Sequence, residues 1–169
     1  MNALRLIAPV LLALCAGQAG VVTAQDAPLT EAAKVPYYSE TADGPAVFKQ
    51  ALAKAATLNR PAVIVFGADW CHDSRALAKV LISDAFKAEF SNRYQVTFID
   101  VGKPQTGEGR NLDLVSGLGV KNLKSTPALF VISPQGKLLN GKKDAVSWRN
   151  AESRGTEQIM AWFRGLDKH

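Results

Sequence analysis

An apolar run that leads directly into a tryptophan–cysteine turn is the feature that most constrains how this chain folds. Ala62–Gly67 (AVIVFG) is continuously apolar and rich in β-branched residues. Such a run is typical of a strand that is covered on both faces, as at the centre of an α/β sheet. The turn 68–74 (ADWCHDS) follows, and residues 75–81 then have the apolar spacing of a helix. The sequence therefore predicts a central strand, a turn that carries Cys71, and a helix.

The rest of the chain alternates between helical and extended patterns. Residues 46–58 predict an amphipathic helix whose apolar face holds Val47, Phe48, Leu52, Ala55 and Leu58. Further helices are predicted at 84–91, with Ser83 as N-cap and Phe86 and Phe90 inward, at 111–116 and at 156–166; strands are predicted at 95–101, 128–132 and 137–139, and a loop at 102–110. This order predicts an α/β fold, with a mixed β-sheet and helices on both faces.

The first 24 residues have the pattern of a signal peptide. Arg5 supplies a positive charge, residues 6–17 are apolar or small, and Val22, Thr23 and Ala24 precede a suitable cleavage point. The apolar stretch is roughly a dozen residues, short of the roughly 20 that span a bilayer. An uncleaved anchor is the alternative; a lipid anchor on Cys15 is disfavoured because Leu14 precedes it.

These features predict three segments: a signal peptide at 1–24, a linker at 25–44 and a folded domain at 45–169. The linker has prolines and no clear period, with one docking element at residues 35–38 (VPYY). The chain of 169 residues is long enough for one domain plus a leader. We expect an exported protein, periplasmic or secreted, that has no stable membrane span after cleavage.

The charged residues give no sign of nucleic-acid binding. The formal net charge is +5, and it falls to +4 when Arg5 leaves with the leader. Lysines and arginines are scattered in short pairs such as Lys142 and Lys143, and no aromatic residues are interleaved with them. We therefore expect a solvated basic surface and no nucleic-acid partner, whereas the oligomeric state is left open.

The two cysteines carry the most information about chemistry. Cys15 lies in the predicted leader, so Cys71 is the only thiol expected in the mature chain. A cysteine at the start of a helix lies near unpaired backbone N–H groups, which stabilise the reactive thiolate. A protonated His72 would act in the same direction, whereas Asp69 and Asp73 would oppose it. The sequence does not decide the balance, and an inert Cys71 is the alternative.

Two motifs resemble the thioredoxin superfamily, over about residues 46–166. The first is Ala68-Asp69-Trp70-Cys71 after an apolar strand; the second is residues 125–131 (STPALFV), which resemble the family's cis-proline segment. The resemblance implies a thioredoxin-like fold in which this segment faces Cys71. It also implies that Thr126 and Pro127 dock an extended substrate backbone. For Trp70, we expect packing against the site rather than a separate function.

Two positions depart from the family pattern. The second cysteine of the family's dithiol is replaced by Ser74, and the family's buried aspartate, six residues before the first cysteine, is replaced by Val65. A thiolate alone can still attack a disulfide, but the mixed disulfide must then be resolved by another thiol. We expect Cys71 to be the nucleophile, with Trp70, His72 and Ser74 in support and Ser74 donating a hydrogen bond to its thiolate.

The sequence therefore predicts a monothiol protein of thiol–disulfide exchange. Protein thiols and disulfides, or glutathione as the resolving thiol, are the expected partners, and the reactions are mixed-disulfide formation, isomerisation or removal of glutathione adducts. The alternative is a binding or chaperone module that uses no covalent chemistry; a single-cysteine peroxidase is disfavoured because its motif is absent. We expect no cofactor and no metal, since adjacent Cys71, His72 and Asp73 cannot easily converge on one ion.

Overall fold

A three-stranded mixed sheet forms the centre of the molecule. The structure, a computed structural model, describes residues 36–166. The strand β1 (Ala62–Gly67) lies in the middle, parallel to β2 (Gln95–Asp100) and antiparallel to β5 (Ala128–Ile132). Every residue of β1 is buried, which confirms the prediction of a central strand covered on both faces.

Alternate residues of the sheet point into two separate apolar layers. Val63 and Val65 belong to one core cluster, together with Leu129 and Val131 of β5. Ile64 and Phe66 belong to the other, in which Phe66 meets the ring of Phe130 edge to face at 5.8 Å. The period-two alternation of a strand therefore explains why both faces of β1 must be apolar.

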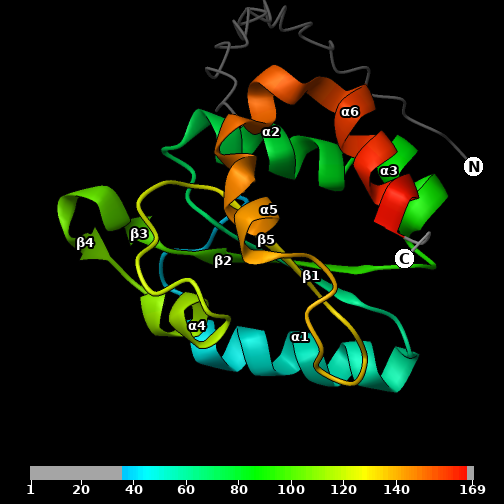
Figure 1. Cartoon of the computed structure of the whole chain (residues 1–169), viewed down its shortest axis with the longest axis horizontal. Coiled ribbons are helices and arrows are strands. Elements are labelled where there is room, and N and C mark those ends of the chain that lie inside the picture. The colour runs from blue at the N-terminus through cyan, green and yellow to red at the C-terminus, as the bar shows by residue number, and fades with distance from the viewer. Residues whose placement is uncertain (1–35, 167–169) are drawn as a thin grey trace, which may run out of the picture. The chain divides into compact units, whose positions relative to one another are not determined.

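Helices cover both of these layers (Figure 1). The helices α1 (Gly44–Leu58) and α4 (Leu112–Gly117) cover one face, whereas α2 (His72–Leu81), α3 (Asp84–Phe90) and α6 (Ala151–Leu166) cover the other. The predicted α/β class, a mixed sheet with helices on both faces, is confirmed.

Local signals set the ends of several helices. The Asp43 carboxylate accepts a hydrogen bond from Ala46 N at 3.0 Å at the start of α1, and Ser83 caps α3 through Phe86 N as predicted. Asn59 ends α1 in the left-handed conformation. Leu58 was expected on the buried face of this helix, but it is the last residue of α1, does not pack against the core cluster and is 40% exposed.

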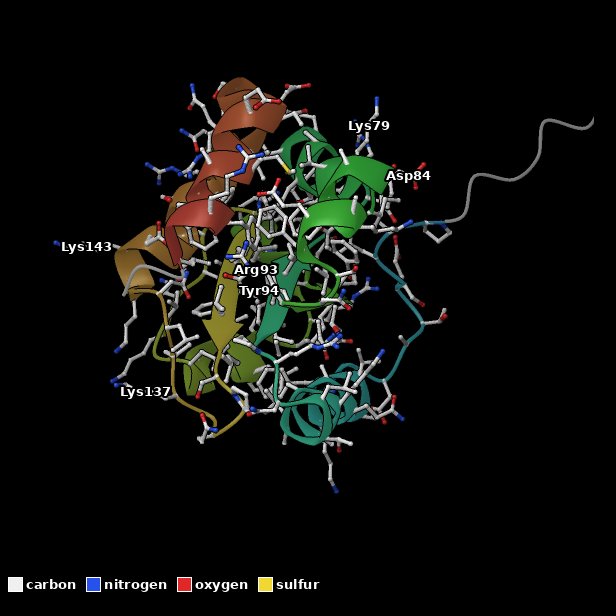
Figure 2. All side chains as sticks on the ribbon, turned by 90° about the vertical axis from the view of Figure 1, so that its right-hand side faces the viewer. Lys79, Asp84, Arg93, Tyr94, Lys137 and Lys143 are labelled. Atoms are coloured by element: carbon white, nitrogen blue, oxygen red, sulfur yellow. The ribbon has the colours of Figure 1, made fainter. Side chains whose placement is uncertain are left out.

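Side chains of α3 and α6 form an aromatic layer over the first face. The rings of Phe86 and Phe90 both contact Phe163, at 4.9 and 5.7 Å between centroids. Tyr94, labelled in Figure 2 beside Arg93, follows α3 and meets the same ring at 5.5 Å. Figure 2 also shows Lys137 and Lys143 pointing outward from the molecule.

The segment predicted as a plain loop at 102–110 contains regular structure. The strands β3 (Gly102–Lys103) and β4 (Glu108–Gly109) form an antiparallel hairpin around a short 3-10 helix, η1 (Pro104–Thr106). Gly102 and Gly107 both have positive φ, 59° and 84°, which explains the glycines at these positions. Lys103 and Glu108 also pair across the hairpin at 3.5 Å.

The chain after β5 differs in three ways from the expected pattern. The predicted strand at 137–139 is reduced to one bridge, between Ile132 and Leu138. A helix α5 (Lys142–Ser147) and a 3-10 turn η2 (Trp148–Asn150) follow, and neither was predicted. The last helix begins at Ala151 rather than at residue 156, because it continues across a kink at Gly155.

Some predictions fall on residues outside the described part of the chain. They are the signal peptide at 1–24, Cys15, and the first part of the linker at 25–44. None of the helices within residues 36–166 has both the length and the apolar character needed to cross a membrane.

Candidate functional site

Cys71 lies at the junction between the central strand and α2. It is the N-cap residue of this helix, with extended backbone angles (φ −84°, ψ 122°), and its side chain caps no backbone N–H. Its side chain is buried, with 7% exposed. Cys71 is the one free cysteine among residues 36–166. The start of α2 brings unpaired N–H groups near the sulfur, an arrangement that favours negative charge there.

The loop before β5 lies directly against this sulfur. The Thr126–Pro127 peptide bond is cis, and both residues are buried. The Cys71 thiol donates a hydrogen bond to the carbonyl oxygen of Thr126, with Sγ and O 3.4 Å apart. Residues that lie 55 positions apart in the sequence therefore meet at the thiol. The Thr126 hydroxyl is also buried, and it has no hydrogen-bond partner among the described residues.

Ser74 lies one helical turn after Cys71 and is fully buried. Its hydroxyl has no hydrogen-bond partner within residues 36–166, so the expected bond from Ser74 to Cys71 is not formed. The physical reason is that Cys71 is a thiol here, which donates to Thr126 and is only a weak acceptor. Val65 is buried in the apolar cluster behind the site, where the family pattern has an acid.

The segment just before α1 closes the back of the site. Tyr38 is 1% exposed, and its hydroxyl donates to the Ser74 carbonyl at 3.2 Å. Asp69 holds this segment in place, because its carboxylate accepts from Tyr37 N at 3.3 Å and Tyr38 N at 3.1 Å. Burial, with a smaller contribution from the Asp69 charge, raises the pKa of Tyr38 well above its ordinary value. Gly67 leaves room for this ring, because a Cβ there would meet both Tyr38 and Ser74.

Trp70 connects the site to the hairpin. Its side chain is 44% exposed, and its indole N–H donates to the Gly102 carbonyl at 2.9 Å. The hairpin at 102–109 is in turn tied to the sheet through Asp100, whose carboxylate accepts from Gly102 N at 2.8 Å. One consequence of the hairpin is therefore to fix the orientation of the Trp70 ring beside Cys71.

His72 points toward acidic groups on α2 and α6. Its Nε2 lies 3.2 Å from an Asp73 oxygen and 3.8 Å from a Glu152 oxygen, and its side chain is 65% exposed. Asp73 also accepts a hydrogen bond from Glu152 N at 2.9 Å, which joins the starts of the two helices. His72 therefore lies beside two carboxylates, one on its own helix and one on α6.

Sequence reasoning missed a buried acid near the site. Asp100 is 3% exposed, and it lies beside Gly67 in the parallel register of β1 and β2. Burial raises its pKa, against the opposing effects of the Gly102 N–H and of Arg110, whose guanidinium lies 3.3 Å away. The only sequence feature that could have pointed to Asp100 was the position of an acidic residue at the end of a predicted strand. Tyr38 was anticipated only as part of a docking element.

The described residues offer no metal site. Within residues 36–166, no three His, Cys, Asp or Glu side chains are grouped so that they could hold an ion. The site therefore consists of one thiol, a cis-proline loop, a buried hydroxyl and an exposed tryptophan. Such an arrangement can support attack by sulfur on an extended polypeptide bound at the loop.

Comparison with known proteins places this arrangement in a family. A search of curated proteins found no match. Among solved structures, the chain is similar to the crystal structure of a disulphide isomerase from Xylella fastidiosa Temecula1, with 32% identity and a TM-score of 0.67, over 77% of this chain and 95% of that one. Residues 46–134, which include Cys71 and the cis Thr126–Pro127 bond, match the family described as Thioredoxin-like. The chain has the thioredoxin-like fold that its two motifs predicted, and it belongs to the thioredoxin-like family.

Proposed function

We propose that this chain is an exported monothiol protein of thiol–disulfide exchange. The observation that carries the proposal is the position of the Cys71 sulfur, at the start of α2 and 3.4 Å from the Thr126 carbonyl of the cis-proline loop. The similarity to a disulphide isomerase supports the same class of chemistry. Within residues 36–166 Cys71 has no second cysteine to pair with, which supports a monothiol mechanism.

The proposed reaction is a thiol–disulfide exchange in two steps. The Cys71 thiolate attacks one sulfur of a client disulfide, or of a glutathione adduct, and forms a mixed disulfide. The displaced thiolate leaves and takes a proton from solvent. An external thiolate, from the client itself, another protein or glutathione, then attacks this mixed disulfide and returns Cys71 to the thiol form. No net electrons are transferred when the external thiol belongs to the same client, and that case is an isomerisation.

The neighbouring residues have supporting roles in this proposal. Thr126 and Pro127 hold the client backbone, and the bond from the Cys71 thiol to the Thr126 carbonyl breaks when the thiolate forms. Trp70 offers an exposed ring beside the sulfur. Ser74 supplies a hydroxyl that has no hydrogen-bond partner among the described residues and can turn toward the thiolate, whereas His72 contributes positive charge near the helix start when protonated. Ser74 cannot resolve the adduct, because a serine hydroxyl does not displace sulfur from a disulfide.

Trapping of adducts tests the nucleophile. Purified wild type and Cys71→Ser would be incubated with a cell-envelope extract and compared on non-reducing gels. We expect adducts in the wild type that are absent from Cys71→Ser and that dithiothreitol releases. The Ser74→Ala variant is the matched control, since it changes the same helix turn and keeps the thiol. If wild type and Cys71→Ser give the same bands, Cys71 is not the nucleophile.

Export is a separate part of the proposal. It rests on the positive charge at Arg5, the short apolar stretch at 6–17 and the small residues that end at Ala24. Fractionation of cells that express the full chain, followed by N-terminal sequencing, tests it. We expect a mature chain outside the cytoplasm that begins at Gln25. If the full-length chain is found in the cytoplasm, the protein is not exported. Cys15 would then remain, and Cys71 would not be the single thiol of the chain.

A non-catalytic binding module is the second candidate, and one observation favours it. Cys71 is 7% exposed and its thiol is engaged with Thr126, which hinders attack on a disulfide. The rate at which Cys71 reacts with a small aromatic disulfide separates the two candidates. Exchange requires a rate at neutral pH at least equal to that of a free cysteine peptide, whereas a rate far below it indicates a protected thiol.

A further inference from the structure

A pocket lined by basic residues lies beside the cis-proline loop. We call it the basic pocket: it is formed by residues 119–125 and by Lys142, Lys143, Val146 and Arg149, and its volume is about 380 Å³. Two segments on either side of β5 in the chain contribute to it, the connection between α4 and β5 and the helix α5 with η2. Its last residue on the first side, Ser125, immediately precedes Thr126, so the pocket adjoins the loop that faces Cys71.

The positive charges of the basic pocket have no acidic partner among the described residues. Its five cationic side chains are Lys121, Lys124, Lys142, Lys143 and Arg149, and all five residues are exposed. None of them makes an ion pair or a side-chain hydrogen bond within residues 36–166, and no acidic residue lines the pocket. Other arginines do have acidic partners: Arg164 pairs with Glu89 and Arg110 with Asp100. The concentration of positive charge at one place selects for an anionic ligand.

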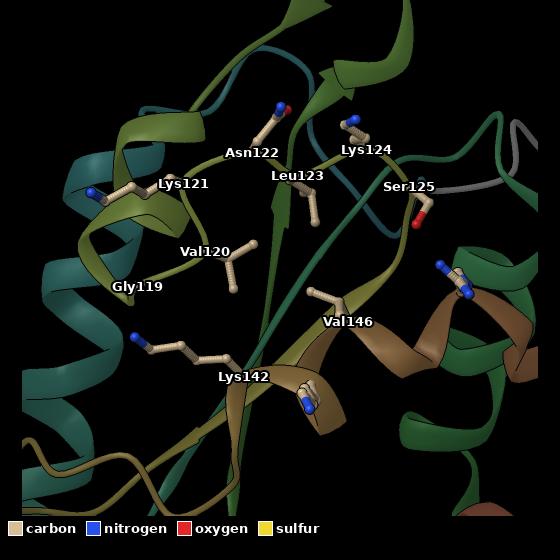
Figure 3. A pocket seen from close by; sticks show the side chains of 11 residues that line it. Gly119, Val120, Lys121, Asn122, Leu123, Lys124, Ser125, Lys142 and Val146 are labelled. Atoms are coloured by element: carbon tan, nitrogen blue, oxygen red, sulfur yellow. The ribbon is translucent and has the colours of Figure 1, made fainter.

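The floor of the basic pocket is apolar. Figure 3 shows Lys121 and Lys142 toward one end and Ser125 at the other, with Val120, Leu123 and Val146 pointing into the space between them. The Lys142 chain lies across Gly119, where φ is 91° and a Cβ would collide with it. A small inorganic anion would leave this apolar floor uncovered. A peptide with acidic and apolar side chains matches both the charges and the floor.

We propose that the basic pocket holds an acidic segment of the client polypeptide while the client's sulfur reacts at Cys71. This inference rests on the proposed exchange function and names its substrate class. A client backbone docked at Thr126 continues past Ser125 into the basic pocket, and an extended chain advances about 3.3 Å per residue. Acidic residues within a few positions of the reacting cysteine therefore lie within reach of the lysines.

The lining of the basic pocket favours a peptide over a nucleic acid. Single-stranded nucleic acids combine basic grooves with aromatic side chains on which the bases stack. Among residues 36–166, none of the residues that line this pocket is aromatic. Acidic side chains of a peptide can bind to the lysines and the arginine without aromatic partners. The apolar floor of valine and leucine can contact apolar side chains that lie between the acidic ones.

Two matched peptides provide the test. Each contains one cysteine, linked in a mixed disulfide to thionitrobenzoate. On one side of this cysteine, the first peptide has four residues that are glutamate and leucine. The second peptide is identical except that each of these glutamates is replaced by glutamine. The release of thionitrobenzoate measures attack by Cys71. At low salt we expect the glutamate peptide to react about tenfold faster, because each exposed charge pair contributes a factor of roughly 1.5 to 5. The ratio should approach one at 1 M salt, where such charges are screened.

Charge variants locate the effect. The variant Lys121→Gln/Lys124→Gln/Lys142→Gln should bring the ratio of the two rates close to one at low salt. The control Lys49→Gln/Lys54→Gln/Lys137→Gln removes the same charge from exposed positions outside the basic pocket, and it should keep the ratio. If Cys71 of the wild type reacts with both peptides at the same rate, or if both variants lose the ratio equally, the proposal is overturned.

A binding measurement separates this proposal from the exchange function. Fluorescence anisotropy with labelled peptides that lack cysteine reports the pocket alone. We expect the glutamate version to bind more tightly than the glutamine version, and the difference to vanish in the pocket variant. If Cys71 reacts with neither thionitrobenzoate peptide but anisotropy still discriminates between them, the exchange function fails and the pocket remains. If Cys71 reacts but neither assay discriminates, the pocket proposal fails and the exchange function remains.

Discussion

Cys71 and Ser74 are three residues apart, at the start of α2, but the thiol and the hydroxyl differ in their hydrogen bonding. The Cys71 thiol donates to the Thr126 carbonyl, whereas the buried Ser74 hydroxyl has no hydrogen-bond partner in the part of the chain that the structure describes. A buried hydroxyl that lacks a partner carries a desolvation penalty of about 1–3 kcal/mol. The hydroxyl is therefore not explained by stability, and a second sulfur at this position would lose no hydrogen bond.

Ser74→Cys should add dithiol chemistry to the site. The new sulfur would lie one helical turn from Cys71, where it can attack a mixed disulfide and release the product. We expect the variant to catalyse insulin reduction with dithiothreitol as donor, with wild type close to the uncatalysed rate. The double variant Cys71→Ser/Ser74→Cys is the control and should be inactive. No gain in Ser74→Cys would indicate a second deficiency, and Val65, which is buried where the family has an acid, would be its first suspect.

Asp100 should make the stability of the fold depend on pH. Burial raises its pKa, so the folded state binds a proton more tightly than the unfolded chain, whose aspartate has its ordinary value near 4. The free energy of unfolding therefore decreases as the pH rises from about 4, the pKa of the unfolded state, through the higher pKa of Asp100 in the folded state. We expect Asp100→Asn, which keeps an oxygen acceptor for Gly102 N, to exceed wild type in stability at pH 7.

Urea unfolding at pH 4 and pH 7 measures this effect. The advantage of Asp100→Asn should shrink toward pH 4, where the wild-type carboxyl becomes protonated. Asp113→Asn removes an exposed carboxylate from α4 and is the matched control. A variant that is less stable than wild type at pH 7 would mean that the Arg110 ion pair outweighs burial, contrary to the expectation.

At the scale of elements, sequence patterns succeeded where the determinant is local. The strand β1 and the Ser83 cap of α3 both depend on residues that are neighbours in the sequence, and both were predicted. The helix α5 was missed because only Ala145 of its six residues is buried, so it has no apolar period. The 102–109 hairpin was missed because its strands have two residues each. The predicted start of the last helix at residue 156 coincides with the kink, since Gly155 interrupts the periodicity.

The kink in α6 predicts opposite effects for two glycines of this helix. Gly155 has φ 71° and ψ 168°, a region that essentially only glycine adopts, and no atom lies near its added Cβ. Gly155→Ala should therefore lower the free energy of unfolding by about 1–3 kcal/mol through backbone strain alone. Gly165→Ala, also without a steric neighbour, should raise it by about 0.4–1 kcal/mol.

Thermal or urea unfolding of the two variants tests this difference. Each variant adds one methyl group to the same helix, so each is the control for the other. A stabilising Gly155→Ala would show that the helix runs straight through residue 155 in solution.

At the scale of the molecule, the site is assembled from segments that the sequence keeps apart. Tyr38, Cys71, Gly102 and Thr126 come from four separate parts of the chain, and hydrogen bonds spanning 32 to 55 residues join them. The family resemblance predicted that the cis-proline segment faces Cys71, and the structure places the Thr126 carbonyl beside the Cys71 sulfur. The motifs could not predict the Tyr38–Ser74 and Trp70–Gly102 contacts, which depend on how the sheet places the loops.

The residues before α1 are therefore expected to stabilise the site, although the domain was predicted to begin at residue 45. Tyr38 fills the core behind Gly67 and Ser74, and Asp69 accepts the backbone N–H groups of this segment. A chain that begins at Gly44 should lose about 3–5 kcal/mol relative to one that begins at Gln25, the range for deletion of a buried aromatic side chain. Tyr38→Ala in the longer chain should reproduce most of this loss.

Urea unfolding of the three chains measures the contribution, with Ser39→Ala as the control because this neighbouring side chain is exposed. Loss of Tyr38 should also speed the reaction of Cys71 with a small aromatic disulfide, since Ser74 and the start of α2 lose the ring that packs behind them. A truncated chain as stable as the longer one would mean that the segment only rests on the domain. A truncated chain that is less stable while Tyr38→Ala is not would assign the effect to the other contacts of the segment, the Asp69 hydrogen bonds and the Asp43 cap of α1.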